Sequence, residues 1–165
     1  MRKFASLLGI GILAASLVVA CSAIAADKLS EKDIPAKIMK SVNGRLPGAQ
    51  LTSAEKETED GNVVYDLELT QKGLKYEMDV KEDGTILEIE KEIKNPAEAV
   101  TKAVKQKYPD AQIKIVMEVN KVEGTKETPQ NYEVTLTTGG KEKEVIVALD
   151  GSSVKEEAAE TPAKK

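Results

Sequence analysis

The sequence predicts an α+β protein made of two tandem units, each with one helix followed by about four antiparallel strands, behind an N-terminal signal peptide. Three observations predict this fold class: an internal repeat, strand-like alternation of apolar residues, and two helical stripes. The repeat is the clearest of them, because residues 65–84 align with residues 132–151 over twenty positions without a gap, eight of them identical. The two units are expected at 34–93 and 95–154.

Each copy of the repeat predicts a β-hairpin that runs into a second turn. Apolar and polar residues alternate in the first copy, as expected for antiparallel strands with one buried face. In both copies a glycine lies eight residues after the leading tyrosine, and Asp-Gly follows as a second turn signal. The residues expected to point inward are Tyr65, Leu67, Leu69, Leu74, Tyr76, Met78 and Val80, with Val134, Leu136 and Val147 in the second copy.

A helix is predicted at the start of each unit. Between residues 34 and 46 an apolar side chain recurs every four positions, which forms one helical stripe, with Pro35 in the first turn. The second helix is predicted to start with Asn95 as its N-cap and Pro96 in its first position. Both helices should therefore pack one apolar stripe against the strands that follow them.

Three further stretches complete the predicted units. Residues 85–92 predict a strand with Glu88 and Glu90 on a solvated face. Residues 113–119 predict a strand whose alternate residues are apolar throughout. The connection at 120–131 is about five residues longer than its counterpart, and we expect a loop there, since loops tolerate insertions and often carry contacts.

The two ends of the chain carry signals for export and for a tail. Two basic residues precede an apolar run of about 17 residues, which is typical of a secretory signal peptide at 1–25. An Ala-x-Ala motif at 23–25 would release a soluble product, whereas a lipobox ending at Cys21 would leave a lipoprotein. We favour the soluble product, periplasmic or secreted, with the membrane-anchored lipoprotein as the alternative. Residues 155–165 predict a disordered tail.

Removal of the signal peptide would leave a chain with no His, Cys, Trp or Phe. This composition excludes Ser–His and Cys–His nucleophiles, His-ligated zinc and disulfides from the mature protein. Acidic residues outnumber basic ones by 28 to 24 in the full chain, which disfavours nucleic acid and anionic membranes as partners. Membrane attachment is therefore expected only through a lipid on Cys21, and no cofactor is expected.

The motifs of this chain resemble those of the PepSY-like family, also described as β-lactamase-inhibitor-like. The resemblance spans residues 34–154 and rests on a proline-started helix, Pro-Gly-Ala before the first strand, Tyr-Asp/Glu-x-x-Leu, a hairpin glycine and Asp-Gly before the last strand. It implies two tandem α-plus-sheet units in an exported bacterial protein. It also implies inhibition or shielding of a peptidase or another envelope enzyme, and it supplies no catalytic residue.

Catalysis and calcium binding are the competing functions. Carboxylate pairs remain available for acid–base chemistry, but the acidic residues mostly alternate with apolar ones as solvated faces do, so we do not expect an enzyme. Calcium takes oxygen ligands, and acidic residues cluster at 57–60 and 79–83, yet neither cluster matches an EF-hand loop. A structural or calcium-binding envelope protein is therefore the alternative function.

The outward face of the predicted sheet is the candidate binding surface of this exported, non-catalytic module. Helices on one side of an antiparallel sheet leave its other face to water or to a partner. Ile146 makes the second half of that face less polar than solubility requires. The expected partner is an envelope protein such as a peptidase. The residues expected on this protein-binding face are Asp66, Glu68, Lys75, Glu77, Glu133, Thr135, Glu144 and Ile146.

Overall fold

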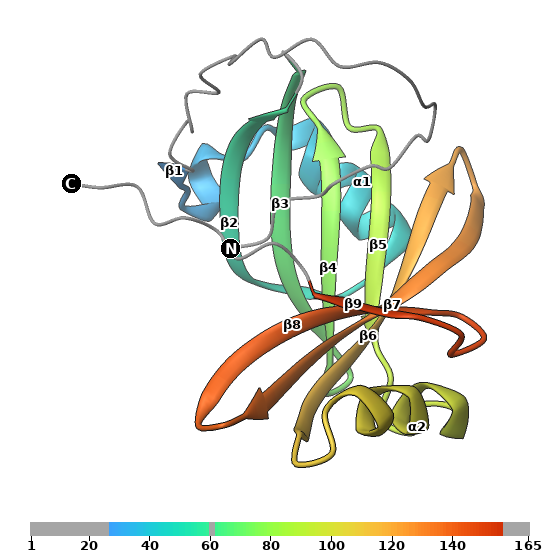
Figure 1. The fold of residues 1–165 in the computed structure, drawn as a ribbon. Coiled ribbons are helices and arrows are strands. Elements are labelled where there is room, and N and C mark those ends of the chain that lie inside the picture. Colours follow the sequence, from blue (N-terminus) through green and yellow to red (C-terminus); the bar gives the residue numbers. More distant parts are fainter. Residues whose placement is uncertain (1–26, 60–61, 157–165) are drawn as a thin grey trace, which may run out of the picture.

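A computed structural model of the chain describes residues 27–59 and 62–156 (Figure 1). Within these residues the protein is a nine-stranded antiparallel sheet in which every strand pairs with its neighbours in the chain. The helices are η1 (Glu31–Asp33, a 3-10 helix), α1 (Ala36–Arg45) and α2 (Glu98–Lys107). The strands are β1 (Asp27–Lys28), β2 (Gln50–Glu59), β3 (Asn62–Gln71), β4 (Leu74–Lys81), β5 (Ile86–Glu92), β6 (Gln112–Glu123), β7 (Lys126–Thr138), β8 (Lys141–Ala148) and β9 (Val154–Glu156).

The predicted fold class, two tandem units of one helix and about four strands, is wrong, because the sheet is continuous. β5 pairs with β6 from Glu88↔Lys121 to Glu92↔Met117, and this pairing joins the strands before α2 to those after it. A sheet that ended at β5 would leave the backbone N–H and C=O groups of this edge unpaired. Pairing with β6 satisfies those groups, so one sheet forms where the repeat suggested two.

One hydrophobic cluster lies between α1 and strands β2–β5. Ile38 and Val42 of α1 are 0% and 1% exposed, as the four-residue spacing of the stripe predicts. Pro35 occupies the N-cap position, and the helical residues begin after it. The strand residues buried in this cluster are Ala54, Tyr65, Leu67, Leu69, Tyr76, Met78, Val80, Ile89 and Val122.

A second hydrophobic cluster lies between α2 and strands β6–β8. Val100 and Val104 of α2 are completely buried in it. The helix begins later than predicted, since Ala97 is its N-cap residue, and Asn95 and Pro96 precede it. The strand residues buried in this cluster are Val116, Val134, Leu136, Val145 and Val147.

The predicted loop at 120–131 is instead part of a long hairpin between β6 and β7. The strands stay paired as far as Glu123↔Lys126, which leaves a two-residue turn, Gly124 and Thr125. β6 and β7 have 12 and 13 residues, against 10 each in β2 and β3, and a register shift after Val119 takes up one of the extra residues of β7. The longer connection therefore extends the sheet rather than forming an irregular loop.

The tip of this hairpin reaches back to α1. Arg45 donates hydrogen bonds of 3.2 Å to the carbonyl oxygens of Gly124 and Thr125. Its Nη1 also lies 3.4 Å from Oε1 of Glu127. Val122 of β6 joins the cluster beneath α1. The extra residues of the second half of the chain thus fasten it to the helix of the first half.

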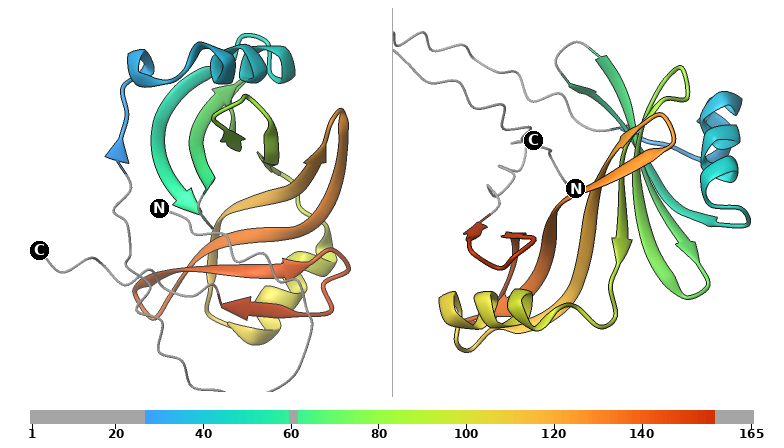
Figure 2. Two further views of the ribbon diagram at one scale, coloured as in Figure 1. Left: turned by 90° about the horizontal axis from the view of Figure 1, so that it is seen from above. Right: turned by 90° about the vertical axis from the view of Figure 1, so that its right-hand side faces the viewer.

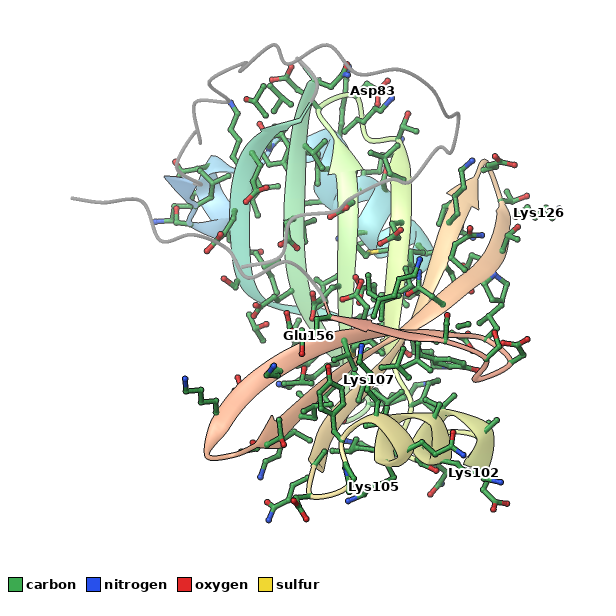
Figure 3. All side chains as sticks on the ribbon, in the orientation of Figure 1. Asp83, Lys102, Lys105, Lys107, Lys126 and Glu156 are labelled. Atoms are coloured by element: carbon green, nitrogen blue, oxygen red, sulfur yellow. The ribbon has the colours of Figure 1, made fainter. Side chains whose placement is uncertain are left out.

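The two α-helices lie at opposite ends of a strongly twisted sheet (Figure 2). β8 runs across the direction of β2–β5 in Figure 1, because the twist between neighbouring strands accumulates over the sheet. α1 and α2 consequently cover different parts of the sheet, and Lys102 and Lys105 project from α2 at its own end of the molecule (Figure 3).

The last strand, β9, holds the C-terminal part of the described chain on β8. Lys155 and Glu156 belong to this strand rather than to the predicted tail. Oε1 of Glu156 accepts hydrogen bonds of 2.7 Å from the Tyr108 hydroxyl and from Nζ of Lys143. Burial, followed by the bond to Glu156, raises the pKa of Tyr108 to about 12. The hydrogen bonds from Lys143 and Tyr108 lower the pKa of Glu156.

The predicted signal peptide at 1–25, with Cys21 and its lipobox, and residues 157–165 of the predicted tail lie outside the described residues. Export, lipidation and a disordered tail therefore stay predictions. Of the α-helices within 27–59 and 62–156, neither has the length and apolar character needed to cross a membrane.

Candidate functional site

Alternation along the strands gives the sheet two distinct faces. Residues that belong to the hydrophobic clusters point toward α1 or α2, and their neighbours in each strand point the other way. No helix of the described chain packs on this second surface, the helix-free face. It carries Asp66, Glu68, Lys75, Glu77, Asp79, Glu88, Glu90, Ile115, Met117, Val119, Glu133, Thr135, Glu144 and Ile146.

Carboxylates stand directly opposite one another across β3, β4 and β5 on this face. Like charges in directly opposite positions destabilise a sheet. Proteins keep destabilising arrangements of this kind mainly at functional sites. The two rows, which we call the carboxylate rows, are Asp66–Asp79–Glu88 and Glu68–Glu77–Glu90.

Several carboxylates of these rows are shielded from water. Asp79 is 8% exposed and Glu90 only 1% exposed. The prediction of a solvated face is therefore wrong for Glu90. Burial of carboxyl groups requires partners within the protein, and such interactions hold the rows in place. The rows thus form an acidic strip that is buried at Asp79 and Glu90 and open to water at Glu68.

A cavity of about 200 Å³ lies beside the carboxylate rows, where the sheet turns from β4 toward β6–β8. Carboxylates come from both sides of it, Glu77 on β4 and Glu133 on β7 among them. β6 contributes the apolar side chains. The cavity is lined by Lys75, Glu77, Ile115, Met117, Glu133, Thr135, Glu142 and Glu144.

A β-bulge in β6 supplies the apolar side chains of this cavity. The prediction placed alternate residues of 113–119 on one face, but the register shifts between Ile113 and Ile115. A bulge inserts an extra residue and reverses the alternation that follows. Ile113 therefore packs against the cluster under α2, whereas Ile115 and Met117 line the cavity on the helix-free face.

Polar contacts fix the rim of the cavity. Thr135 donates its hydroxyl to Oε1 of Glu144 at 3.3 Å. At the start of β4, the backbone N–H of Lys75 donates to Oε2 of Glu92 at 3.0 Å, and Lys94 pairs with the other oxygen of the same carboxylate. The hydrogen bond from Lys94 lowers the pKa of Glu92, and the bond from Lys75 acts in the same direction. Glu92 therefore ties β4 to β5 as a charged group beside the cavity.

All eight residues predicted for the binding face lie on the helix-free face, at two adjoining places. Five line the cavity: Lys75, Glu77, Glu133, Thr135 and Glu144. Asp66 and Glu68 belong to the carboxylate rows, and Glu68 lies opposite Glu77. Ile146 lies beside the cavity, because it pairs with Glu133 across β7 and β8. Their part in binding stays a prediction.

The sequence placed Glu90 on the outward face but did not indicate its burial opposite Glu77, and it did not place Ile115 and Met117 on this face. The signal for Glu90 was its register opposite Glu77, which requires the strand pairing to be known. The signal for Ile115 and Met117 was a bulge, which the apolar pattern of β6 conceals because residues on both of its faces are apolar.

Of the two acidic clusters considered for calcium, only the one at 79–83 lies wholly within the described residues. Within residues 27–59 and 62–156 no group of three or more His, Cys, Asp or Glu side chains is placed to hold a metal ion. Asp79 belongs to the carboxylate rows, whereas Asp83 accepts a 2.9 Å hydrogen bond from the backbone N–H of Thr85 in the β4–β5 turn. That backbone bond lowers the pKa of Asp83. Asp60, in the other cluster, lies outside the described residues.

Solved structures share this architecture, although neither a protein-family model nor a curated protein matches the sequence. A protein of Bacteroides eggerthii, provisionally assigned to the periplasm, matches with a TM-score of 0.56 and 11% identity over 74% of this chain and 88% of its own. A DUF2874 family protein of Bacteroides uniformis matches with a TM-score of 0.54 and 11% identity, over the same shares of 74% and 88%. A BLIP-like protein of Bacteroides fragilis matches with a TM-score of 0.52 and 18% identity over 77% of this chain and 90% of its own.

This chain shares its fold with the BLIP-like protein of Bacteroides fragilis. At identities of 11–18% the likeness concerns the fold alone. The expected β-lactamase-inhibitor-like resemblance is confirmed at that level. The PepSY-like assignment is not shown, and the continuous sheet contradicts two separate units. The BLIP-like fold leaves the helix-free face as the broad sheet surface that no described helix covers.

Proposed function

We propose that this protein is an exported, non-catalytic binding module that contacts a protein partner through its helix-free face. The observation that carries the proposal is the cavity lined by four glutamates and by Ile115 and Met117, with the two carboxylate rows beside it. An acidic, partly apolar hollow on an open sheet face favours contact with a partner of complementary charge.

Composition supports contact rather than chemistry. The full chain has no His, and its single Cys belongs to the predicted signal peptide. The groups near the cavity are carboxylates, one threonine hydroxyl and one ammonium group. Such groups bind well, and none forms a nucleophile–base pair of the Ser–His or Cys–His kind. We therefore propose that the protein alters a partner by covering or holding it.

The envelope is the proposed location, and an envelope enzyme such as a peptidase is the proposed partner. The apolar run before residue 25 is typical of export, and one solved relative in fold is provisionally assigned to the periplasm. The soluble form is favoured, and a lipoprotein anchored through Cys21 is the alternative.

Partner capture from an envelope fraction tests this function. The wild type is compared with a double variant, Glu144→Lys and Ile146→Lys, which places two cations on the helix-free face. The control is Glu98→Lys with Gln106→Lys, which makes the same change in charge at exposed positions of α2. We expect the face variant to lose a partner that the wild type and the control both retain. Equal capture by all three proteins contradicts the proposal.

A further inference from the structure

We propose that the cavity on the helix-free face is the seat of a lysine or arginine side chain presented by the protein partner. This inference rests on the proposed function, because it names the chemistry that the partner brings to the same face. Three properties of the cavity support it: the charge of its lining, its apolar side chains and its size.

The lining is strongly acidic. Four glutamates face one lysine around the cavity, and the carboxylate rows continue the negative charge along β3, β4 and β5. Glu133 is only 6% exposed, so a cation beside its carboxylate would meet little competing water. Ammonium and guanidinium groups form their strongest hydrogen bonds with carboxylates. The charge of the lining therefore selects a cationic guest.

The apolar side chains decide which kind of cation fits. Ile115 and Met117 lie among the glutamates, and Met117 is 4% exposed. Lysine and arginine carry aliphatic stems that pack on apolar surface while their charged ends remain among polar groups. A metal ion has no stem to cover these two side chains, and a wholly apolar guest would make no hydrogen bonds with the glutamates. A long basic side chain satisfies both halves of the lining.

The volume agrees with a single side chain. The cavity measures about 200 Å³, whereas sites for drug-sized ligands measure roughly 300–1,000 Å³. Buried basic side chains that fill a pocket are frequent anchors of protein interfaces, arginine above all. The partner would therefore insert one residue and cover the surrounding face.

The distribution of charge over the molecule favours this approach. α1 carries three basic residues and no acidic one, and α2 carries three basic residues and one acidic residue. The chain as a whole has a formal net charge of −4, so its negative charge gathers away from the helices. A basic partner would be steered toward the helix-free face and away from the helix ends.

Small probes test the seat directly. The full chain, labelled with ¹³C at methionine and isoleucine methyl groups, is titrated with Nα-acetylarginine amide and, separately, with Nα-acetylnorleucine amide, which has an apolar stem and no charge. We expect saturable shifts of the Met117 and Ile115 methyl signals with the arginine probe. The norleucine probe should leave both signals in place.

Charge-neutral variants locate the contact. Glu133→Gln and Glu144→Gln keep the shape of the side chain and remove its charge, so each should weaken the arginine probe about tenfold. Glu82→Gln makes the same change at an exposed position of the β4–β5 turn and should bind the probe like the wild type. Unchanged methyl spectra of the unliganded variants show that each has kept its fold.

Three outcomes of these titrations would overturn the inference. The seat is disproved if neither methyl signal shifts with the arginine probe, if the norleucine probe shifts them equally, or if Glu82→Gln weakens binding as much as Glu133→Gln. The two proposals can fail separately. In one case the Glu144→Lys, Ile146→Lys variant loses partner capture, but the wild type does not bind the arginine probe. The binding function then stands, and the seat is disproved. Probe binding with partner capture intact in that variant shows that the partner does not use the cavity, which also overturns the seat.

Discussion

The glycine of each Asp-Gly turn has a second task besides turning the chain. Gly84 and Gly151 have φ values of +89° and +73°, which favour glycine at both positions. Each also lies against a helix: a Cβ atom on Gly84 would be 2.9 Å from Oγ of Ser41, and one on Gly151 would be 2.7 Å from the carbonyl oxygen of Ala99. The repeat therefore keeps glycine where a helix meets the sheet.

Substitution of Gly151 by Ala should destabilise the protein more than substitution of Gly73. Both positions have positive φ, +73° and +78°, but nothing lies within 4 Å of a Cβ on Gly73. Gly73→Ala should lower the free energy of unfolding by about 1–2 kcal/mol through backbone strain alone. Gly151→Ala should cost about 2–5 kcal/mol, because α2 must also move away from the turn. Urea unfolding measures both, and equal losses would show that the helix contact has no energetic weight.

Residue by residue, the sequence was informative about orientation and poor about burial. Alternation put Asp66 and Glu144 on the outward face because side-chain direction in a strand follows from position alone. It could not place Glu90 opposite Glu77, since register depends on which strands pair. Nor could it detect the bulge that turns Met117 toward the cavity.

Arg45 of α1 holds the tip of the β6–β7 hairpin through its guanidinium group. Arg45→Met keeps most of the apolar stem and removes the hydrogen bonds to the carbonyls of Gly124 and Thr125. The free energy of unfolding should fall by about 1–3 kcal/mol, the range for hydrogen bonds that involve a charged donor. Lys40→Met, at an exposed position of the same helix, should change it by less than about 0.5 kcal/mol.

Amide hydrogen exchange shows whether the loss is local. In Arg45→Met the amides near the hairpin tip, from Val122 to Lys126, should exchange faster than in the wild type, while those of β3 keep their protection. Unchanged exchange at the tip would mean that the hairpin stands without α1.

At the scale of elements, the helices were predictable and the hairpin was not. Both apolar stripes identified a helix, with boundaries off by a few residues, because four-residue spacing is a strong signal. The stretch at 120–131 contains glycine and proline, which usually break strands. Pro129 is tolerated within β7 because it lies beside the register shift, where regular pairing is already interrupted.

The whole molecule should unfold in one step. The sheet is continuous through β5 and β6, and Val122 of β6 packs in the cluster beneath α1. Neither cluster can lose its strands without disturbing the other, so the two should melt together. Scanning calorimetry should give a calorimetric enthalpy equal to the van't Hoff enthalpy. Two separate heat-absorption peaks would show that the shared sheet does not couple the halves.

At this scale the sequence revealed the repeat but not its consequence. The equal spacing of the two copies led us to expect two units. The strand pairing does repeat, since Tyr65 lies opposite Val80 and Tyr132 lies opposite Val147. Whether two such patterns form two sheets or one depends on the edge of β5, which no local motif records. The fold class was therefore wrong although its parts were recognised.

The order of the strands also governs how the chain reaches this structure. Each strand pairs with the next one in the sequence, and the longest connections between described strands run from β1 through α1 to β2 and from β5 through α2 to β6. Every pairing therefore closes a modest length of chain, and the entropy lost in closing it is small. Folding slows as the mean sequence separation of contacts grows, which makes many β-proteins slow. A chain that adds strands in order escapes much of that delay, and its sheet can grow outward from any hairpin that forms first.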